Sequence, residues 1–198
     1  MSVAANASGG GLVGFNSGTI TNAFATGDVT GAAGSNGITT LGGLAAVNLG
    51  SISNSLASGD VGSPNVANLQ AAGLVGNNSG TILSSIALGN VQAGDGSIAG
   101  GLIASNSVNT SIANSGAITA SQASGDVTVG AASVGGGLVG DSAGAITNST
   151  ASGVVASTGP NSIVGGLVGD STGFITNSSA SGAVTSTGAT APSAAWSR

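Results

Sequence analysis

The sequence predicts an all-β protein that folds as a single-stranded parallel β-helix, or β-solenoid, of about six coils. Three observations support this prediction. One pattern of small and apolar residues recurs six times along the 198 residues. Apolar and polar residues alternate within each copy, which is the period of a strand with one buried face. Glycine, at 38 residues, interrupts the chain too often for stable helices.

Two anchors define the repeat. Each copy contains an isoleucine with glycine two residues before it, and alanine, glycine and valine five, seven and nine residues after it. The isoleucines are Ile20, Ile52, Ile82, Ile118, Ile146 and Ile175. A Gly-Leu pair precedes each one, with the leucines at Leu12, Leu44, Leu74, Leu102, Leu138 and Leu167. Leucine stands 8 residues before isoleucine, except in the fourth copy, where an eight-residue insertion within Ala104–Ser115 makes the gap 16.

Each copy is predicted to supply three strands. The first is the Gly-Leu-Val-Gly stretch, the second surrounds the isoleucine, and the third is the Ala-x-Gly-x-Val tail. In the first tail, we expect Ala25, Gly27 and Val29 to point inward, because they are small or apolar and two residues apart. Thr26 and Asp28 then face solvent.

These elements divide the chain into three parts. Residues 1–9 form an N-terminal lead-in, residues 10–185 form the six-copy solenoid, and residues 186–198 form an irregular C-terminal tail. Within the solenoid, the segment between each valine and the next leucine varies in length and includes Pro64 and Pro160, which is typical of a surface loop. The tail holds Pro192 and Trp196, and it is either a loose end or a small cap over the last coil.

Recurring glycine and asparagine predict the corners of the coil. Glycine fits where a tight corner needs a positive φ, or where a narrow interior leaves no room for a Cβ. We expect the asparagine two residues after the isoleucine to turn a corner and to stack on its counterparts in a ladder of amide hydrogen bonds. These asparagines are Asn22, Asn54, Asn148 and Asn177, with Ser84 and Ala120 in the third and fourth copies.

Composition excludes several classes of function. The chain has no Cys, His, Tyr, Glu or Lys, and its single cation is Arg198. Nucleic-acid binding and membrane insertion are therefore not expected, because one cation is too few to neutralise phosphates and there is no apolar stretch of about 20 residues. No serine has a base to activate it, and no glycine cluster ends in the Gly-Lys-Ser/Thr of a phosphate-binding loop. We assign no catalytic, cofactor-binding or metal-binding residue, and no cofactor.

Three of the six aspartates share one outward position of the repeat. Asp28, Asp60 and Asp126 occupy it, with Asn90 in the third copy. Asp28 and Asp60 are expected about 5 Å apart on adjacent coils, which is near the carboxylate separation of retaining glycosidases. A carboxylate pair for catalysis and a weak calcium site remain alternatives. We favour a solvated acidic stripe, because the sequence supplies no aromatic sugar platform and no evident pocket.

Threonine and serine flank the inward isoleucine and suggest a second function. The outward pairs are Thr19/Thr21, Ser51/Ser53, Thr81/Leu83, Ala117/Thr119, Ala145/Thr147 and Phe174/Thr176. A flat array of threonines could order water and bind ice. Only the first copy has the full threonine pair, and Leu83 and Phe174 interrupt the array.

The repeat resembles a known bacterial motif. The pattern GGLVG-x-x-x-G-x-I-x-N-S-x-A-x-G-x-V, clearest at residues 10–29, 136–155 and 165–184, resembles the GLUG repeat of large bacterial surface and secreted proteins, including filamentous haemagglutinin-like exoproteins and adhesins. The third copy, GLVGNNSGTILSSIALGNV, is a looser match. The resemblance implies a right-handed β-helix, export across the bacterial envelope, and adhesion or surface architecture. The usual hand of parallel crossovers agrees.

These observations predict a non-enzymatic scaffold or stalk of a secreted or surface-exposed bacterial protein. Its binding would be weak and extended, over the sheet faces and the loops around Asn65–Gln70 and Asn106–Asn114. The partners expected are host or matrix glycans and proteins, other cells, or further copies stacked end to end. The first ten residues lack the basic and apolar regions of a signal peptide, so no export signal is expected within this chain.

Overall fold

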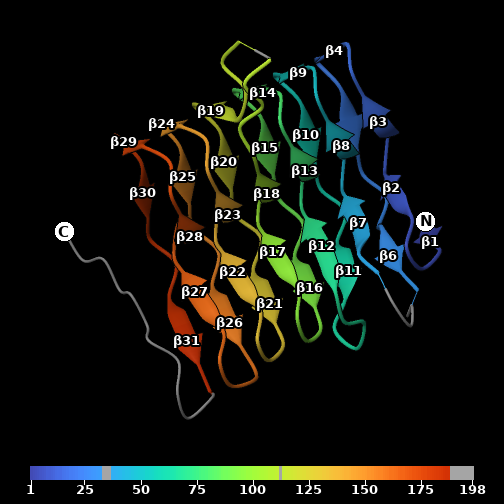
Figure 1. Ribbon diagram of the computed structural model, residues 1–198, viewed down its shortest axis with the longest axis vertical. Coiled ribbons are helices and arrows are strands. Elements are labelled where there is room, and N and C mark those ends of the chain that lie inside the picture. Colours follow the sequence, from blue (N-terminus) through green and yellow to red (C-terminus); the bar gives the residue numbers. More distant parts are fainter. Residues whose placement is uncertain (33–36, 112, 188–198) are drawn as a thin grey trace.

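The chain forms a β-solenoid of about six turns, as predicted. The structure is a computed structural model that describes residues 1–32, 37–111 and 113–187. These ranges contain 31 short strands and no helix, and therefore no helix that could cross a membrane. The coils lie side by side, from β1 at the N-terminal end to β31 at the other end (Figure 1).

Five strands make one coil, rather than the three predicted. The second coil shows the order: β7 (Thr39–Gly42), β8 (Ala45–Asn48), β9 (Ser51–Ser53), β10 (Leu56–Ala57) and β11 (Val61–Ser63). The Gly-Leu pair lies in a bend between β7 and β8. The Ala-x-Gly-x-Val tail is also split, because its alanine ends β10 and its valine begins β11. In this coil the predicted alternation is correct, because Ala57, Gly59 and Val61 are buried and Asp60 is exposed. In the first coil Ala25 and Val29 are buried as predicted, but Gly27 is exposed.

Equivalent strands of successive coils pair in parallel and build five sheets, which are numbered in chain order. Sheet 1 holds β2 (Ser8–Gly10), β7, β12 (Leu69–Ala72), β17 (Ile98–Gly100), β22 (Val134–Gly136) and β27 (Ile163–Gly165). Sheet 2 holds β3 (Val13–Asn16), β8, β13 (Val75–Asn78), β18 (Ile103–Asn106), β23 (Val139–Ser142) and β28 (Val168–Ser171). Sheet 3 holds β4 (Thr19–Thr21), β9, β14 (Thr81–Leu83), β19 (Ala117–Thr119), β24 (Ile146–Thr147) and β29 (Ile175–Thr176).

The remaining two sheets close the coil. Sheet 4 holds β5 (Phe24–Ala25), β10, β15 (Ile86–Ala87), β20 (Gln122–Ala123), β25 (Thr150–Ala151) and β30 (Ser179–Ala180). Sheet 5 holds β11, β16 (Val91–Ala93), β21 (Val127–Val129), β26 (Val155–Ser157) and β31 (Val184–Ser186). The pair β1 (Ser2–Val3) and β6 (Thr30–Gly31) extends sheet 5, because a parallel bridge joins Val29 to Val61.

The register confirms the repeat alignment read from the sequence. The six anchor isoleucines pair with one another from coil to coil across sheet 3. The leucine, isoleucine and alanine columns pack as one apolar cluster, and the valines of sheet 5 pack with Leu41 and Leu69 as a second. The interior is therefore narrow and lined by aliphatic side chains, as the composition required.

The recurring glycines mainly permit close stacking of the backbone. A Cβ on Gly50 would lie 2.0 Å from the carbonyl oxygen of Gly18, and a Cβ on Gly59 would lie 2.4 Å from that of Gly27. Of the six glycines before the isoleucines, only Gly116 has a positive φ, of 68°. Thus the second reason given for glycine, lack of room for a Cβ, holds for most copies.

Described strands run into both predicted end segments. The lead-in at residues 1–9 already contains β1 and most of β2, which pair with β6 and β7. In the predicted tail, Ser186 is the last residue of β31, whereas Pro192 and Trp196 lie outside the described residues.

Candidate interaction surface

A buried asparagine ladder runs through the first four coils. Nδ2 of Asn16 donates to Oδ1 of Asn48 at 2.7 Å, Asn48 donates to Asn78 at 2.7 Å, and Asn78 donates to Asn106 at 2.8 Å. Asn106 then donates to Oγ of Ser142 at 3.1 Å. The sequence analysis missed this ladder, although its signal was present as an Asn or Ser four residues after every Gly-Leu leucine.

The asparagines that were predicted to form the ladder have a different role. The six residues two positions after the isoleucines all have φ between 48° and 54°, so they do turn a corner. Their side chains lie on the outer surface, and the described structure shows no amide ladder among Asn22, Asn54, Asn148 and Asn177. The ladder predicted for this column was therefore wrong, because the left-handed corner directs these side chains into solvent.

A serine column follows each corner and satisfies the backbone there. Ser55, Ser85, Ser121 and Ser149 are buried, and each hydroxyl donates to the carbonyl oxygen two residues earlier at 2.8–3.0 Å. Each hydroxyl oxygen also accepts the N–H of the equivalent residue in the preceding coil, as in Ser55 N to Ser85 Oγ at 3.3 Å. These serines are structural, so they are not free to act as nucleophiles.

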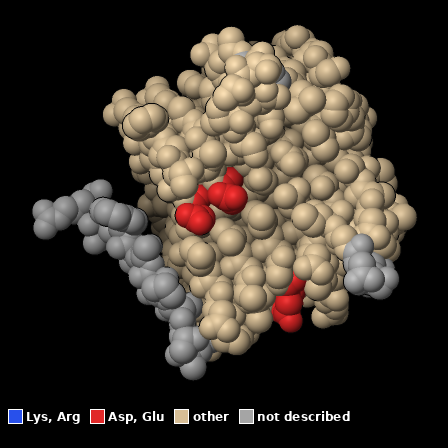
Figure 2. Space-filling model, in the orientation of Figure 1, with Lys and Arg blue, Asp and Glu red and all other residues tan. Residues whose placement is uncertain are grey.

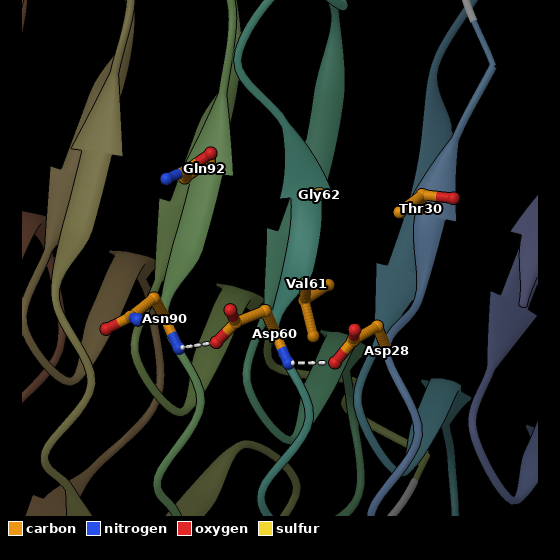
Figure 3. A pocket seen from close by; sticks show the side chains of 7 residues that line it. All are labelled: Asp28, Thr30, Asp60, Val61, Gly62, Asn90 and Gln92. Carbon is orange, nitrogen blue, oxygen red and sulfur yellow. Dashed lines mark hydrogen bonds between the residues drawn. The ribbon is translucent and has the colours of Figure 1, made fainter.

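The outward aspartates form a ladder of their own with the backbone. Oδ1 of Asp28 accepts the N–H of Asp60 at 2.9 Å, and Oδ1 of Asp60 accepts the N–H of Asn90 at 2.8 Å (Figure 3). Asn90 and Asp126 continue the pattern onto the next two coils at 2.9 and 2.8 Å. The carboxylates thus stabilise a corner, since each one accepts a backbone donor that the strands leave unpaired.

A shallow depression lies beside this ladder. It has a volume of about 110 Å³, and Thr30 and Gln92 line it together with Asp28, Asp60 and Asn90 (Figure 3). In the described ranges, no three Asp, Glu, His or Cys side chains gather where they could hold a metal ion. The depression is open and offers carboxylate and amide oxygens to solvent.

A second acidic pair lies on sheet 2. Asp141 of β23 and Asp170 of β28 are direct partners in the parallel register. Burial raises the pKa of the Asp141 carboxyl, and the charge of Asp170 raises it further. Figure 2 shows two acidic side chains next to each other over β23 and β28, on a face where the other side chains drawn are mostly uncharged. The sequence analysis counted these aspartates but did not bring them together.

The threonine and serine positions of sheet 3 align in two outward columns. Thr19, Ser51, Thr81 and Ala117 share the first column, and Thr21, Ser53, Leu83, Thr119, Thr147 and Thr176 share the second. The hydroxyls of Thr21 and Ser53 lie 3.0 Å apart and bond to each other. Phe174, at 83% exposure, stands at the edge of the last coil. The two outward columns of hydroxyl-bearing residues therefore exist, but Ala117 interrupts the first and Leu83 interrupts the second.

The insertion of the fourth coil protrudes as a loop between β18 and β19, at the top of the solenoid in Figure 1. The N–H of Asn109 donates to Oγ of Ser115 at 2.8 Å, and that hydroxyl donates back to the carbonyl of Asn109 at 2.8 Å. These bonds close the base of the loop. Val108 is half exposed at its surface.

The other loop predicted to bind partners, around Asn65–Gln70, is partly buried and partly in a strand. Val66 is buried against the second apolar cluster, and Leu69 and Gln70 already belong to β12. Its exposed part, with Pro64, Asn65 and Ala67, borders an open hollow of about 300 Å³ shared with Gly94 and Asp95. Asp95 is held in place there, because its Oδ1 accepts the N–H of Ala131 at 2.7 Å.

Comparison with known proteins identifies one motif. No curated protein and no solved structure matches the chain. The family model of the GLUG motif matches residues 5–30, which run from just before β2 through the first residue of β6. The same anchor positions recur in register in the five following coils. The chain therefore contains a GLUG repeat segment.

Proposed function

We propose that this chain is a non-enzymatic scaffold or stalk segment of a secreted or surface-exposed bacterial protein, with weak and extended binding surfaces. One observation carries the proposal: the recurring polar residues are committed to ladders that join coil to coil. The asparagine and serine ladders are buried, and the aspartate ladder binds backbone N–H groups. Such ladders stiffen a rod and leave few polar groups for chemistry.

The outer surface supports binding that is broad rather than focused. It carries Ser, Thr and Asn with few charges, and the loop between β18 and β19 is the feature that interrupts the regular outline. Solenoids commonly bear binding loops on one face. The GLUG match at residues 5–30 supports the repeat scaffold, while adhesion, the haemagglutinin-like context and export to the cell surface are part of our proposal.

The loop allows a sharp test of adhesion. Deleting residues 108–115 joins Ser107 to Gly116 and recreates the Asn-Ser-Gly connection of residues 78–80. Both ends are already in place, because Ser107 N donates to Asn78 O at 2.8 Å and Gly116 N donates to Gly80 O at 2.8 Å. The shortened chain should therefore keep its fold.

The intact and shortened chains are compared in a binding screen against glycans and matrix proteins. Binding that is lost with the loop supports an adhesive contact there, and Val108→Ser tests its exposed apolar side chain within the full-length chain. Binding by both chains places the contact on the sheet faces. If neither binds, the adhesive part of the proposal fails, and saturable turnover of any substrate contradicts the non-enzymatic part.

Ice binding is a second candidate, supported by the two outward columns of sheet 3. Thr119 and Thr147 lie in the second column on consecutive coils, about 4.8 Å apart, and Leu83 separates them from Ser53. Ice recrystallisation is measured at micromolar protein for the wild type, for Leu83→Thr, which completes the second column, and for Thr119→Lys. Inhibition that Leu83→Thr strengthens and Thr119→Lys weakens supports ice binding. If neither the wild type nor either variant inhibits recrystallisation, the ice-binding hypothesis is wrong.

A further inference from the structure

Two outward columns of the solenoid change their chemistry in the same half of the molecule. On sheet 1 the paired outward positions become apolar from the fourth coil onward, in the order Ser8, Thr40, Gln70, Ile98, Val134 and Ile163. On sheet 2 the paired outward positions become acidic from the fifth coil onward, in the order Phe15, Val47, Asn77, Ser105, Asp141 and Asp170. We call the surface formed by Ile98, Val134, Ile163, Asp141 and Asp170 the acidic-apolar face.

The apolar and acidic columns of this face lie side by side. A Cβ on Gly140 would lie 2.8 Å from Cγ2 of Ile98, and Gly140 directly precedes Asp141 in β23. The next coil repeats the arrangement, because a Cβ on Gly169 would lie 2.8 Å from Cγ1 of Val134. The apolar side chains of sheet 1 therefore lie against the backbone that carries the carboxylates, and glycine permits this contact because it has no side chain.

The two carboxylates of this face differ from the other four in the chain. A side-chain oxygen accepts a backbone N–H in Asp28, Asp60, Asp95 and Asp126. Asp141 and Asp170 accept no hydrogen bond from any described residue, although they are direct partners on adjacent strands. Burial, and then the charge of Asp170, raise the pKa of the Asp141 carboxyl. Like charges placed opposite each other are destabilising, and no hydrogen bond within the described ranges offsets that cost.

We propose that the acidic-apolar face binds a protein segment that carries arginine or lysine among aliphatic side chains. Charge complementarity selects this partner, because the described surface has no Lys or Arg side chain and the chain has a net charge of −5. The two carboxylates lie on adjacent strands, about 4.8 Å apart, so one guanidinium, with donors on two edges, can bond to both. Aliphatic side chains of the partner then cover the apolar column, in which Ile163 is 43% exposed.

This inference deepens the proposed function, because it gives the weak binding one face and one partner chemistry. It does not involve the loop between β18 and β19. The loop deletion and the experiment below can therefore fail independently of each other.

The test measures the binding of fluorescent peptides to the full chain by anisotropy. The probe is a short peptide that alternates arginine and valine, and two counterparts carry glutamate in place of arginine or serine in place of valine. We expect the arginine–valine peptide to bind most tightly and the glutamate peptide not to bind. Binding should weaken at high salt, because salt screens the attraction between exposed charges.

Two matched pairs of variants locate the contact. Asp141→Asn should weaken binding about fivefold, whereas Asp126→Asn removes the same charge from the corner between sheets 4 and 5 and should have no such effect. Asn90 occupies that corner position in another coil, so the control variant can keep its hydrogen bond. Val134→Thr should weaken binding about threefold, whereas Val154→Thr, at a 38% exposed valine of the same distant corner, should not.

Circular dichroism of each variant checks that the solenoid is intact, and Asp170→Asn replaces Asp141→Asn if the latter does not fold. If the Asp141 variant weakens binding no more than Asp126→Asn, the peptide is held by net charge alone and the acidic-apolar face is wrong. If the arginine–valine peptide does not bind, or if the serine counterpart binds equally well, the partner chemistry is wrong. Either result leaves the scaffold proposal standing, since the screen against glycans and matrix proteins tests that separately.

Discussion

The fifth and sixth coils have nearly the same sequence and very different environments. Residues 136–155 and 165–184 share their glycine, leucine, isoleucine, alanine and valine positions. Ile146 and Val155 of the fifth coil are fully buried, whereas Ile175 is 44% exposed and Val184 is only partly buried. The difference shows that a coil does not bury its own apolar residues. Coils on both sides bury them, since Leu12 of the first coil is 51% exposed although the second coil follows it. Stability therefore resides largely in the interfaces between coils.

The largest effect should come from a charge placed in this interface. Val155→Asp puts a carboxylate among apolar side chains at 0% exposure, and we expect a loss of about 3 kcal/mol or more in the free energy of unfolding. Val184→Asp, at the paired position of the sixth coil, should cost much less, because solvent reaches it. Urea unfolding measures both, with exposed Ser152→Asp as control. Equal losses for the two valines would contradict the comparison.

The asparagine ladder should show the same contrast between an inner coil and an end coil. Asn78→Ala removes a residue bonded on both sides, leaving one N–H of the Asn48 side-chain amide and the side-chain oxygen Oδ1 of Asn106 without partners in the interior. We expect a loss of about 2–4 kcal/mol, since each unsatisfied buried group costs about 1–3 kcal/mol. Asn16→Ala, at the end of the ladder, breaks the bond to a single asparagine and should cost less. Thermal unfolding distinguishes the two, and a larger loss for Asn16→Ala would be evidence against the ladder.

A single methyl group tests the spacing of the coils. A Cβ on Gly153 would lie 2.0 Å from the carbonyl oxygen of Gly125, whereas a Cβ on Gly27 would meet no atom within 4 Å. Both glycines occupy the same position of the repeat. We expect Gly153→Ala to cost about 1–3 kcal/mol through overpacking, and Gly27→Ala to remain within about 0.5 kcal/mol of the wild type. Chemical denaturation compares them directly. A neutral Gly153→Ala would mean that the coils stack less closely than described.

The smallest effect concerns pH. The pKa of Asp141 is raised above the ordinary 3.8 by burial and by Asp170, so the folded state binds this proton more tightly than the unfolded state. This contribution to stability is present at low pH and is lost as the pH rises from about 3.8 through the raised pKa. Asp141→Asn should therefore flatten the pH dependence in that window and slightly stabilise the protein at pH 7. Denaturation of both proteins at several pH values measures how the free energy of unfolding changes with pH. If the slope is the same in Asp141→Asn as in the wild type, the prediction is wrong.

Several features followed from the sequence by itself. The six copies, their register, the inward leucine, isoleucine, alanine and valine, and the protruding insertion are all confirmed. They could be predicted because each coil repeats one local pattern and parallel stacking aligns equal positions. The corner at the asparagine column was also predicted, although the positive φ had been expected at glycine; asparagine adopts it here because it tolerates the left-handed conformation better than most residues.

Only the tertiary structure decided the number of strands, the ladder and the ends. Three expected strands became five because the Gly-Leu pair and the Ala-x-Gly-x-Val tail each bend between two sheets. The buried ladder belongs to Asn48 and its partners rather than to the Asn54 column, because side-chain direction depends on the corner and not on recurrence. Exposure of the sixth coil was likewise invisible in its residues, since burial is set by the coil that stacks on it.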